Sequence, residues 1–172
     1  MQEDWAKAIE FVLDAEGGYG NDPNDKGGET NFGISKRRYP NEDIKNLTKE
    51  RASELYKKDF WEKCACDQLP SPLAIAVFDA AVNQGETGAG RMLQIALQFT
   101  GAADQEIDGI IGANTVTAAH KFGPKLLRRF MAQRMARYIR IVMKDFTQDA
   151  WTENWSNRLM KLAQLVFAEK NA

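Results

Sequence analysis

The sequence predicts a mainly α-helical protein with about seven helices. Apolar residues recur three and four positions apart along most of the chain, which is the spacing of one helix face. No run alternates convincingly between apolar and polar residues, so a short hairpin within residues 19–35 is the only sheet expected. The length of 172 residues suits one sizeable core, with at most a small appendage.

The first helix is expected over residues 3–16, where three apolar residues and Glu16 share one face. Gly17 and Gly18 end this helix, and a glycine-rich loop follows. Thr48 is typical of a helix N-cap, which predicts a second helix reaching about residue 62.

The segment LAIAVFDAAVNQG, residues 73–85, predicts a helix in the middle of the core because it is apolar nearly all round. Ser71 is expected to cap this helix, with Pro72 in its first turn and Gly85 at its end. Asp79, inside the apolar run, is interpreted as a buried, hydrogen-bonded structural group.

The second half predicts helices over residues 88–100, 113–121 and 124–145, with a tight loop at 108–112. A last helix carries Trp151 and Trp155, which are interpreted as core rather than as a sugar platform. The basic residues of the long helix are interpreted as a solvated face: Lys125, Arg128, Arg129, Arg134, Arg137, Arg140 and Lys144.

Composition excludes several classes of function. The net charge of -1 gives no field that favours nucleic acid, and no run of 18 apolar residues predicts membrane insertion. The acidic N-terminus does not read as a secretory signal. Cys64 and Cys66 are too close in sequence for a disulfide between them to link distant segments. Two cysteines and the single His120 are also poor support for a zinc site or a Cys-His nucleophile pair. We therefore expect no metal and no organic cofactor.

Glu16 is the first candidate for chemistry. It lies on an apolar face and in the last turn of its helix, where burial and the helix dipole both disfavour a negative charge. An unpaired carboxylate there would favour the protonated form, as a general acid for glycoside cleavage requires. The alternative is a glutamate that turns out into solvent where the helix frays.

The glycine-rich loop supplies candidates for a second carboxylate. Asp22 and Asp25 lie six and nine residues beyond Glu16, and the glycines allow the loop to fold back over the helix end. Asp25 is preferred, because Asp22 precedes a proline and fits a turn. Thr30 and Asn31 could hold a water or a sugar. The alternative reading of the loop is turn chemistry alone.

The pattern E-G-G-Y-x-N-D-P-x-D-x-G-G-x-T-N-x-G-I, residues 16–34, resembles the signature of the glycoside hydrolase family 108 lysozymes, which are N-acetylmuramidases common in phages and prophages. F-D-A-A-V-N-Q-G, residues 78–85, is similar to the central helix of that family, and residues 92–170 resemble the predicted peptidoglycan-binding domain that follows it. The resemblance implies a lysozyme-like, mainly α fold. We expect a hydrolase region over 1–91 and a peptidoglycan-binding region over 92–172, packed integrally on the first.

The resemblance also implies an endolysin-type peptidoglycan hydrolase that cleaves the β-1,4 bond between N-acetylmuramic acid and N-acetylglucosamine, with Glu16 as catalytic acid. Roles for Asp25 and Thr30 follow from a looser resemblance to phage lysozymes of another family, in which an acid, an aspartate and a threonine form a triad. In that pattern the threonine is one residue farther from the aspartate than Thr30 is from Asp25. A lytic transglycosylase and a non-catalytic wall-binding or phage structural protein remain the alternatives.

The expected partners are peptidoglycan glycan strands and a holin-type export partner. Synthesis in the cytoplasm and action on the wall after release are expected with them.

Four residues are candidates for substrate binding: Tyr19, Asn31, Asn83 and Gln84. The two amides at 83 and 84 end the apolar helix, so they can face a cleft, although capping before the glycine that follows explains them equally well. Tyr19 and Trp61 could stack on sugar rings, and the alternative for both is ordinary packing.

Overall fold

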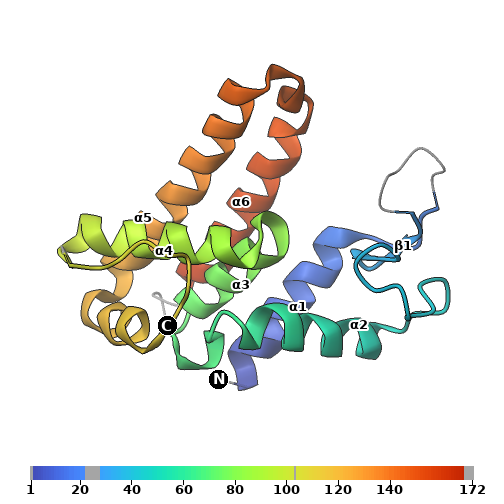
Figure 1. Ribbon diagram of the computed structural model, residues 1–172, viewed down its shortest axis with the longest axis horizontal. Helices are drawn as coiled ribbons and strands as arrows, with labels where there is room; N and C mark the ends of the chain where they lie inside the picture. Colours follow the sequence, from blue (N-terminus) through green and yellow to red (C-terminus); the bar gives the residue numbers. More distant parts are fainter. Residues whose placement is uncertain (1, 22–27, 103, 169–172) are drawn as a thin grey trace.

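The computed structural model describes residues 2–21, 28–102 and 104–168. It is mainly helical, as predicted, with one small two-stranded sheet in the described residues (Figure 1). The elements are α1 (Gln2–Glu16), β1 (Thr30–Asn31), β2 (Ile34–Ser35), α2 (Lys49–Tyr56), η1 (Lys57–Glu62), η2 (Cys66–Gln68), α3 (Leu73–Gln84), α4 (Glu86–Thr100), α5 (Ala113–Lys144), η3 (Phe146–Trp151) and α6 (Thr152–Phe167).

Strands β1 and β2 form the hairpin predicted within residues 19–35, with Asn31 opposite Ile34. The two turn residues, Phe32 and Gly33, have φ values of 49° and 75°. Positive φ at both positions is the type I′ geometry that matches the twist of paired strands. Before the hairpin, the backbones of Gly20 and Thr30 exchange hydrogen bonds of 2.8 and 2.9 Å, which brings the chain after α1 alongside β1.

Helix α3 lies at the centre of the fold and contacts α1, α4, α5 and α6. Its Phe78 packs edge-on against Trp5 and Trp61, with ring centroids 5.4 and 5.5 Å away. The start of α3 differs from the prediction: the Ser71 hydroxyl donates to Asp4 on α1 rather than capping α3. The hydroxyl therefore ties the two helices together instead of satisfying a free N–H of its own helix.

Helix α2 begins as predicted, because the Thr48 hydroxyl oxygen accepts a hydrogen bond from the backbone N–H of Arg51 at 3.2 Å. The chain then continues to Glu62 as a π-helix, η1, so the expected end near residue 62 is correct although the helix type changes. Phe60 and Trp61 in η1 are both buried, which makes Trp61 a core residue rather than a sugar platform.

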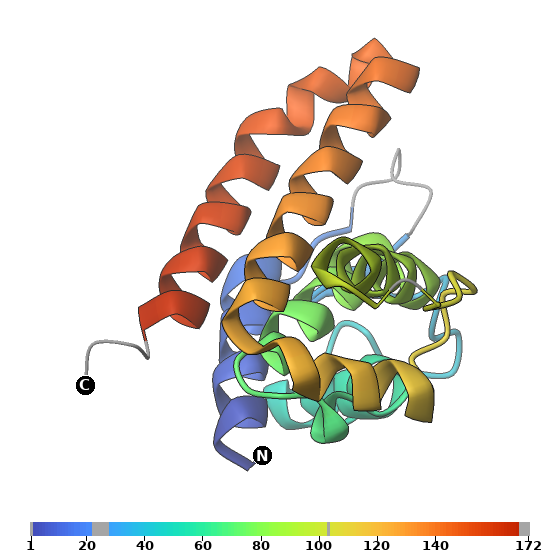
Figure 2. The same cartoon turned by 90° about the vertical axis from the view of Figure 1, so that its left-hand side faces the viewer.

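Helix α5 contains the boundary that the sequence predicted between two helices. Gly123 has φ 44° and ψ −130°, which are not helical, and Pro124 restarts the helix without a backbone donor. The part of α5 after this kink runs beside α6. Both views show this pair projecting beyond the other helices (Figures 1 and 2).

Two interpretations of the second half are wrong. Arg134 is fully buried, at 0% exposure, rather than part of a solvated basic face. Trp151 is 54% exposed rather than in the core. Trp151 is the last residue of η3, directly before α6, and this end of the α5–α6 pair projects beyond the other helices (Figure 1), so few elements can cover its indole.

The loop at 108–112 is tight, as predicted, and is bonded to the buried Gln94 of α4. The Gln94 amide donates to Asp108 at 2.6 Å and accepts from the backbone N–H of Gly109 at 2.7 Å. Gly90 of α4 packs against the Gly109 backbone, where a side chain on Gly90 would collide with the carbonyl oxygen. Side-chain hydrogen bonds and a close backbone approach thus fix this loop on α4.

Candidate active site

Glu16 is the last residue of α1, and its carboxylate lies between the hairpin turn and α6. A Cβ built on Gly33 would stand 2.9 Å from both Cγ and Oε2 of Glu16 and would also collide with the Tyr56 hydroxyl. The turn of the hairpin therefore rests directly on the glutamate, and only glycine fits at that position.

The Glu16 carboxylate has a partner that the sequence reasoning did not include. Arg158 of α6 donates from Nη1 to Oε1 of Glu16 at 2.6 Å and from Nε to Oδ1 of Asp79 at 2.9 Å. On the other side of Asp79, Nη1 of Arg134 lies 2.6 Å from Oδ2. The predicted role of Asp79 as a buried, hydrogen-bonded group is confirmed, whereas the assumption of an unpaired Glu16 is wrong.

This ion-pair network, Arg134–Asp79–Arg158–Glu16, runs from the core to the surface. Side-chain exposure rises along it, from 0% and 1% for the first pair to 11% and 24% for the last. Two cations and two carboxylates balance, so the buried charges are compensated as burial requires. Glu16 is the end of the network that solvent or a ligand can reach.

The arginine of this pair is held in its charged form. Burial alone would lower the pKa of Arg158, but the charges of Asp79 and Glu16 outweigh it and raise that pKa above its ordinary value. The guanidinium is thus a permanent cation 2.6 Å from the candidate acid.

Tyr56 supports the site from the opposite side. Its hydroxyl donates to the backbone carbonyl of Phe32 at 2.9 Å, which holds that turn residue in its left-handed conformation. Burial, and after it the charge of Glu16, raises the pKa of Tyr56, so the phenol stays a neutral donor. The turn that rests on Glu16 is therefore anchored to α2.

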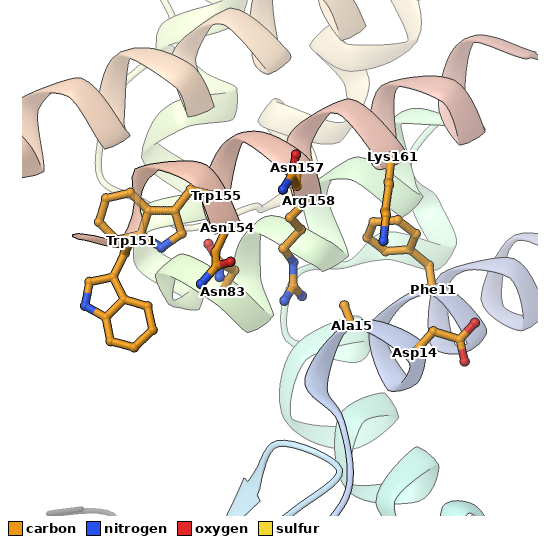
Figure 3. A pocket seen from close by; sticks show the side chains of 10 residues that line it. All are labelled: Phe11, Asp14, Ala15, Asn83, Trp151, Asn154, Trp155, Asn157, Arg158 and Lys161. Atoms are coloured by element: carbon orange, nitrogen blue, oxygen red, sulfur yellow. The ribbon is translucent and has the colours of Figure 1, made fainter. Parts of the chain in front are cut away.

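A cavity of about 730 Å³ lies between the ends of α1 and α3 and the length of α6 (Figure 3). Helix α6 and the residue before it provide most of the lining, with Trp151 and Trp155 at one end and Lys161 at the other. Arg158 and Ala15 also line the cavity, so it reaches the partner and the sequence neighbour of Glu16. A volume of this size is ordinary for a ligand site.

Of the two amides predicted to bind substrate from α3, one lines this cavity. Asn83 does so, and its Oδ1 accepts a hydrogen bond from the Tyr138 hydroxyl at 2.6 Å. Both amide atoms of Gln84 are buried and have no hydrogen-bond partner among the described residues. Gln84 instead borders a separate hollow near Gly85 and Arg137, so the structure does not bring it to the cavity.

The candidates from the loop and hairpin have other contacts. Asn31 is buried, and its Nδ2 donates to the carbonyl of Ile44 at 3.1 Å. The Thr30 hydroxyl donates to the carbonyl of Gly28 at 3.4 Å. Tyr19 is exposed, and its hydroxyl donates to Glu29 at 3.1 Å. None of the three predicted residues lines the cavity beside α6. Their roles in binding and catalysis stay predictions.

The second carboxylate stays a prediction as well. Asp22, Asp25 and the rest of 22–27 lie outside the described residues.

The sequence reasoning missed Arg158, although a signal for it was present. Trp155, Arg158 and Leu162 are spaced three and four apart, so the arginine stands on the apolar stripe of α6. The same pattern drew attention to Glu16 on its own helix. A charge on an apolar stripe indicates a buried partner, so Arg158 could have been singled out as a paired residue, although not as the partner of Glu16.

The cysteines and the histidine do not form a reactive pair. Cys64 and Cys66 are free and buried, and burial raises the pKa of Cys64 to about 12 and that of Cys66 well above its ordinary value. A thiol that stays protonated is a poor nucleophile. The His120 ring nitrogen Nε2 lies 2.9 Å from the backbone carbonyl of Gln68.

The fold is mainly helical and presents Glu16 between a small hairpin and the wall of a cavity. Residues 9–85 match the family described as Glycosyl hydrolase 108, and residues 88–160 match the Predicted Peptidoglycan domain. The two matches follow one another along the chain, in the order that the sequence resemblance indicated, and support a glycoside hydrolase that acts on peptidoglycan.

One solved structure is similar to the chain along its whole length. The chain is similar to the structure of Brucella abortus SagA, with 28% identity and a TM-score of 0.80 over 100% of this chain and 98% of that one. No match was found among curated protein sequences. Within residues 2–21, 28–102 and 104–168, no helix has the length and apolar character needed to cross a membrane.

Proposed function

We propose that the chain is an N-acetylmuramidase that hydrolyses the β-1,4 bond between N-acetylmuramic acid and N-acetylglucosamine, with Glu16 as general acid. The observation that carries this proposal is the placement of Glu16 at the accessible end of the ion-pair network, under the hairpin turn. The family matches support glycan hydrolysis of peptidoglycan in general.

Arg158 has a defined part in this mechanism. Glu16 is a carboxylate in the ion pair, so it must first take up a proton, which it then passes to the leaving glycosidic oxygen. A negative charge develops again on its carboxyl group as the proton leaves. The Arg158 guanidinium, already 2.6 Å from Oε1, stabilises that charge without rearrangement. Asp79 keeps the guanidinium in place from the other side. The oxocarbenium-like centre then needs a second group to stabilise it or to position a water.

Asp25 is proposed for that second role, and Thr30 for orienting the water. Asp25→Ala should reduce lysis of purified cell wall far more than Asp22→Ala, because Asp22 precedes Pro23 and fits a turn. Both variants are checked for folding by circular dichroism. A greater loss of turnover in Asp22→Ala would assign the second carboxylate to the other aspartate.

The substitution Glu16→Gln tests the acid directly. The amide keeps the shape of the side chain but cannot donate an acidic proton, so wall lysis should fall by about 10² to 10⁴. Glu10→Gln, an exposed residue of the same helix, should lyse at the wild-type rate. Wild-type lysis by Glu16→Gln would remove Glu16 from the mechanism.

The same variant has a defined effect on stability. The sequence alone suggested that a neutral residue at the helix end would be stabilising, but the ion pair with Arg158 reverses the expected sign. Because Arg158 keeps Asp79 as a partner, the loss should be only about 1 kcal/mol, as measured by urea denaturation.

The reaction products identify the chemistry. Hydrolysis adds a water to the muramic acid end, whereas a lytic transglycosylase leaves an anhydro sugar. Mass spectrometry of digested wall should show the hydrated product. A dominant anhydro product would make the protein a transglycosylase that still uses Glu16.

We also propose that a holin-type pore releases the protein to the wall, as the family resemblance implied. Expression in bacteria should cause lysis from within only when such a pore is co-expressed. Lysis without it would show another route of delivery.

A further inference from the structure

We propose that the cavity wall formed by the start of α6, the residue before it and the end of α3 binds an N-acetylated hexosamine of the glycan strand, with Trp151 as its stacking platform and Asn154 and Asn83 as its amide partners. This inference rests on the proposed function only for the choice of a glycan as ligand. It assigns a binding site to residues that the catalytic argument does not use.

Trp151 presents a large aromatic surface to this cavity. The residue is 54% exposed, and its side chain lines the cavity at the end away from Lys161 (Figure 3). An exposed indole is costly in water unless something covers it, and the flat apolar face of a hexose ring is a suitable cover. The indole N–H remains available to a sugar hydroxyl.

The neighbouring Trp155 is held rigidly in place. Its ring stacks on Tyr138 with centroids 4.8 Å apart and an angle of 11° between planes. The Tyr138 hydroxyl in turn donates to Oδ1 of Asn83 at 2.6 Å. These contacts join α6, α5 and α3 at one wall of the cavity, so the wall is ordered before a ligand arrives, which lowers the entropic cost of binding.

Amide groups give this wall its chemical preference. Asn83 and Asn154 both line the cavity, and the Asn83 Nδ2 has no hydrogen-bond partner among the described residues. A carboxamide offers both a donor and an acceptor, which matches the N–H and C=O of an acetamido group. Aromatic and amide groups together favour an N-acetylated sugar over a purely apolar ligand.

The position of the wall also favours a glycan over a lipid surface. Exposed apolar residues lie nearby, at Met143 and Phe146, but neither lines this cavity. The cavity instead continues along α6 to Arg158, which bonds to the Glu16 carboxylate. A strand bound against Trp151 would therefore extend toward the acid.

The four tryptophans allow a direct binding test. Indole N–H signals in ¹⁵N-labelled protein are assigned by single Trp→Phe variants and followed during titration with a soluble N-acetylglucosamine oligosaccharide. The Trp151 and Trp155 signals should shift, while those of Trp5 and Trp61, which pack in the core with Phe78, should not. Titration with no shift at Trp151 would overturn the proposal.

A kinetic comparison supplies the second test. Trp151→Ala should raise the apparent KM for purified peptidoglycan at least about fivefold with a smaller change in kcat, as loss of a binding hot spot does. Phe99→Ala, which removes an aromatic residue of similar exposure (62%) outside the cavity, should leave both values unchanged. An unchanged KM in Trp151→Ala, or equal effects of the two substitutions, would contradict a sugar site there.

The outcomes separate this inference from the proposed function. Shifts at Trp151 with undiminished lysis by Glu16→Gln would support the sugar site and remove the proposed acid. Loss of lysis in Glu16→Gln without shifts at Trp151 would do the reverse. Sedimentation of wild type but not Trp151→Ala with phosphatidylcholine–phosphatidylglycerol vesicles, without oligosaccharide binding, would replace the glycan with a lipid surface.

Discussion

Charged residues on apolar helix faces define the chemistry of this chain at the scale of single residues. Glu16, Asp79, Arg134 and Arg158 each stand where a helix turns its apolar face inward. Each would be costly there alone, because a buried charge loses its hydration. Together they compensate one another, and the one with the greatest exposure is the candidate acid.

Asp79→Asn tests how strongly the network depends on its central carboxylate. The substitution leaves Arg134 fully buried without a counter-charge, so the free energy of unfolding should fall by about 3 kcal/mol or more in urea denaturation. Asp59→Asn, which breaks an ion pair with the exposed Lys63, should cost about 1 kcal/mol or less. Similar losses in the two variants would mean that the buried network contributes no more than a surface pair.

The buried thiol of Cys64 predicts a loss of stability in alkali. Folding raises its pKa to about 12, so its contribution is complete below the ordinary value of 9.0 and is lost as the pH rises toward 12. Cys64→Ala removes this titration. The difference in unfolding free energy between wild type and variant should therefore shrink between about pH 8 and about pH 10.5. A difference that stays constant over this range would show that the thiol titrates normally in the folded protein.

The hairpin is the element that positions the acid. Its turn needs a glycine for two reasons, the φ of 75° and the contact of that position with Glu16 and Tyr56. Any side chain at residue 33 must either push the carboxylate away or open the turn. The hairpin turn thus limits the positions that the Glu16 carboxylate can take at the end of α1.

Gly33→Ala should therefore reduce both stability and wall lysis. Backbone strain alone costs an L-residue about 1–2 kcal/mol, and the collision adds to it. Gly28→Ala is the matched control, because its φ of 70° carries similar strain while the nearest atom of the described residues to its added Cβ is 3.9 Å away. Lysis per folded molecule should fall in Gly33→Ala and not in Gly28→Ala. Equal lysis by both variants would show that the turn does not hold Glu16.

At the scale of the whole molecule, the two family regions share one core and one ion-pair network. Glu16 and Asp79 lie in the region that matches the hydrolase family, and Arg134 and Arg158 lie in the region that matches the peptidoglycan domain. Helix α3 of the first region contacts α4, α5 and α6 of the second. The second region therefore contributes to the candidate active site itself.

A fragment ending at Gly90 should accordingly aggregate or melt without cooperativity, and should not lyse cell wall. It would expose the faces of α3 that α5 and α6 cover, and it would leave Asp79 without either arginine. Calorimetry and wall lysis on the fragment and the full chain test this. A cooperatively folded, active fragment would show that the two regions are separable domains.

The sequence by itself determined the main helices, the hairpin and the family resemblance. Local patterns decide these features: the apolar spacing of α1, the all-round apolar α3, the breaks at Gly85 and before Pro124, and the long glycine-rich signature that begins at Glu16. The sequence also indicated that Asp79 would be buried and hydrogen-bonded, because a carboxylate inside an apolar helix faces the core and needs a partner there.

Only the tertiary structure decided which residues meet. Glu16 and Arg158 lie 142 positions apart. A charge on an apolar stripe indicates that the charged group has a partner, but not which residue that partner is. The exposure of Trp151 likewise depends on how far α6 extends beyond the elements that could cover it, which helical periodicity does not encode. Spacing along a chain specifies the face of a helix, whereas the packing of distant helices specifies what that face contacts.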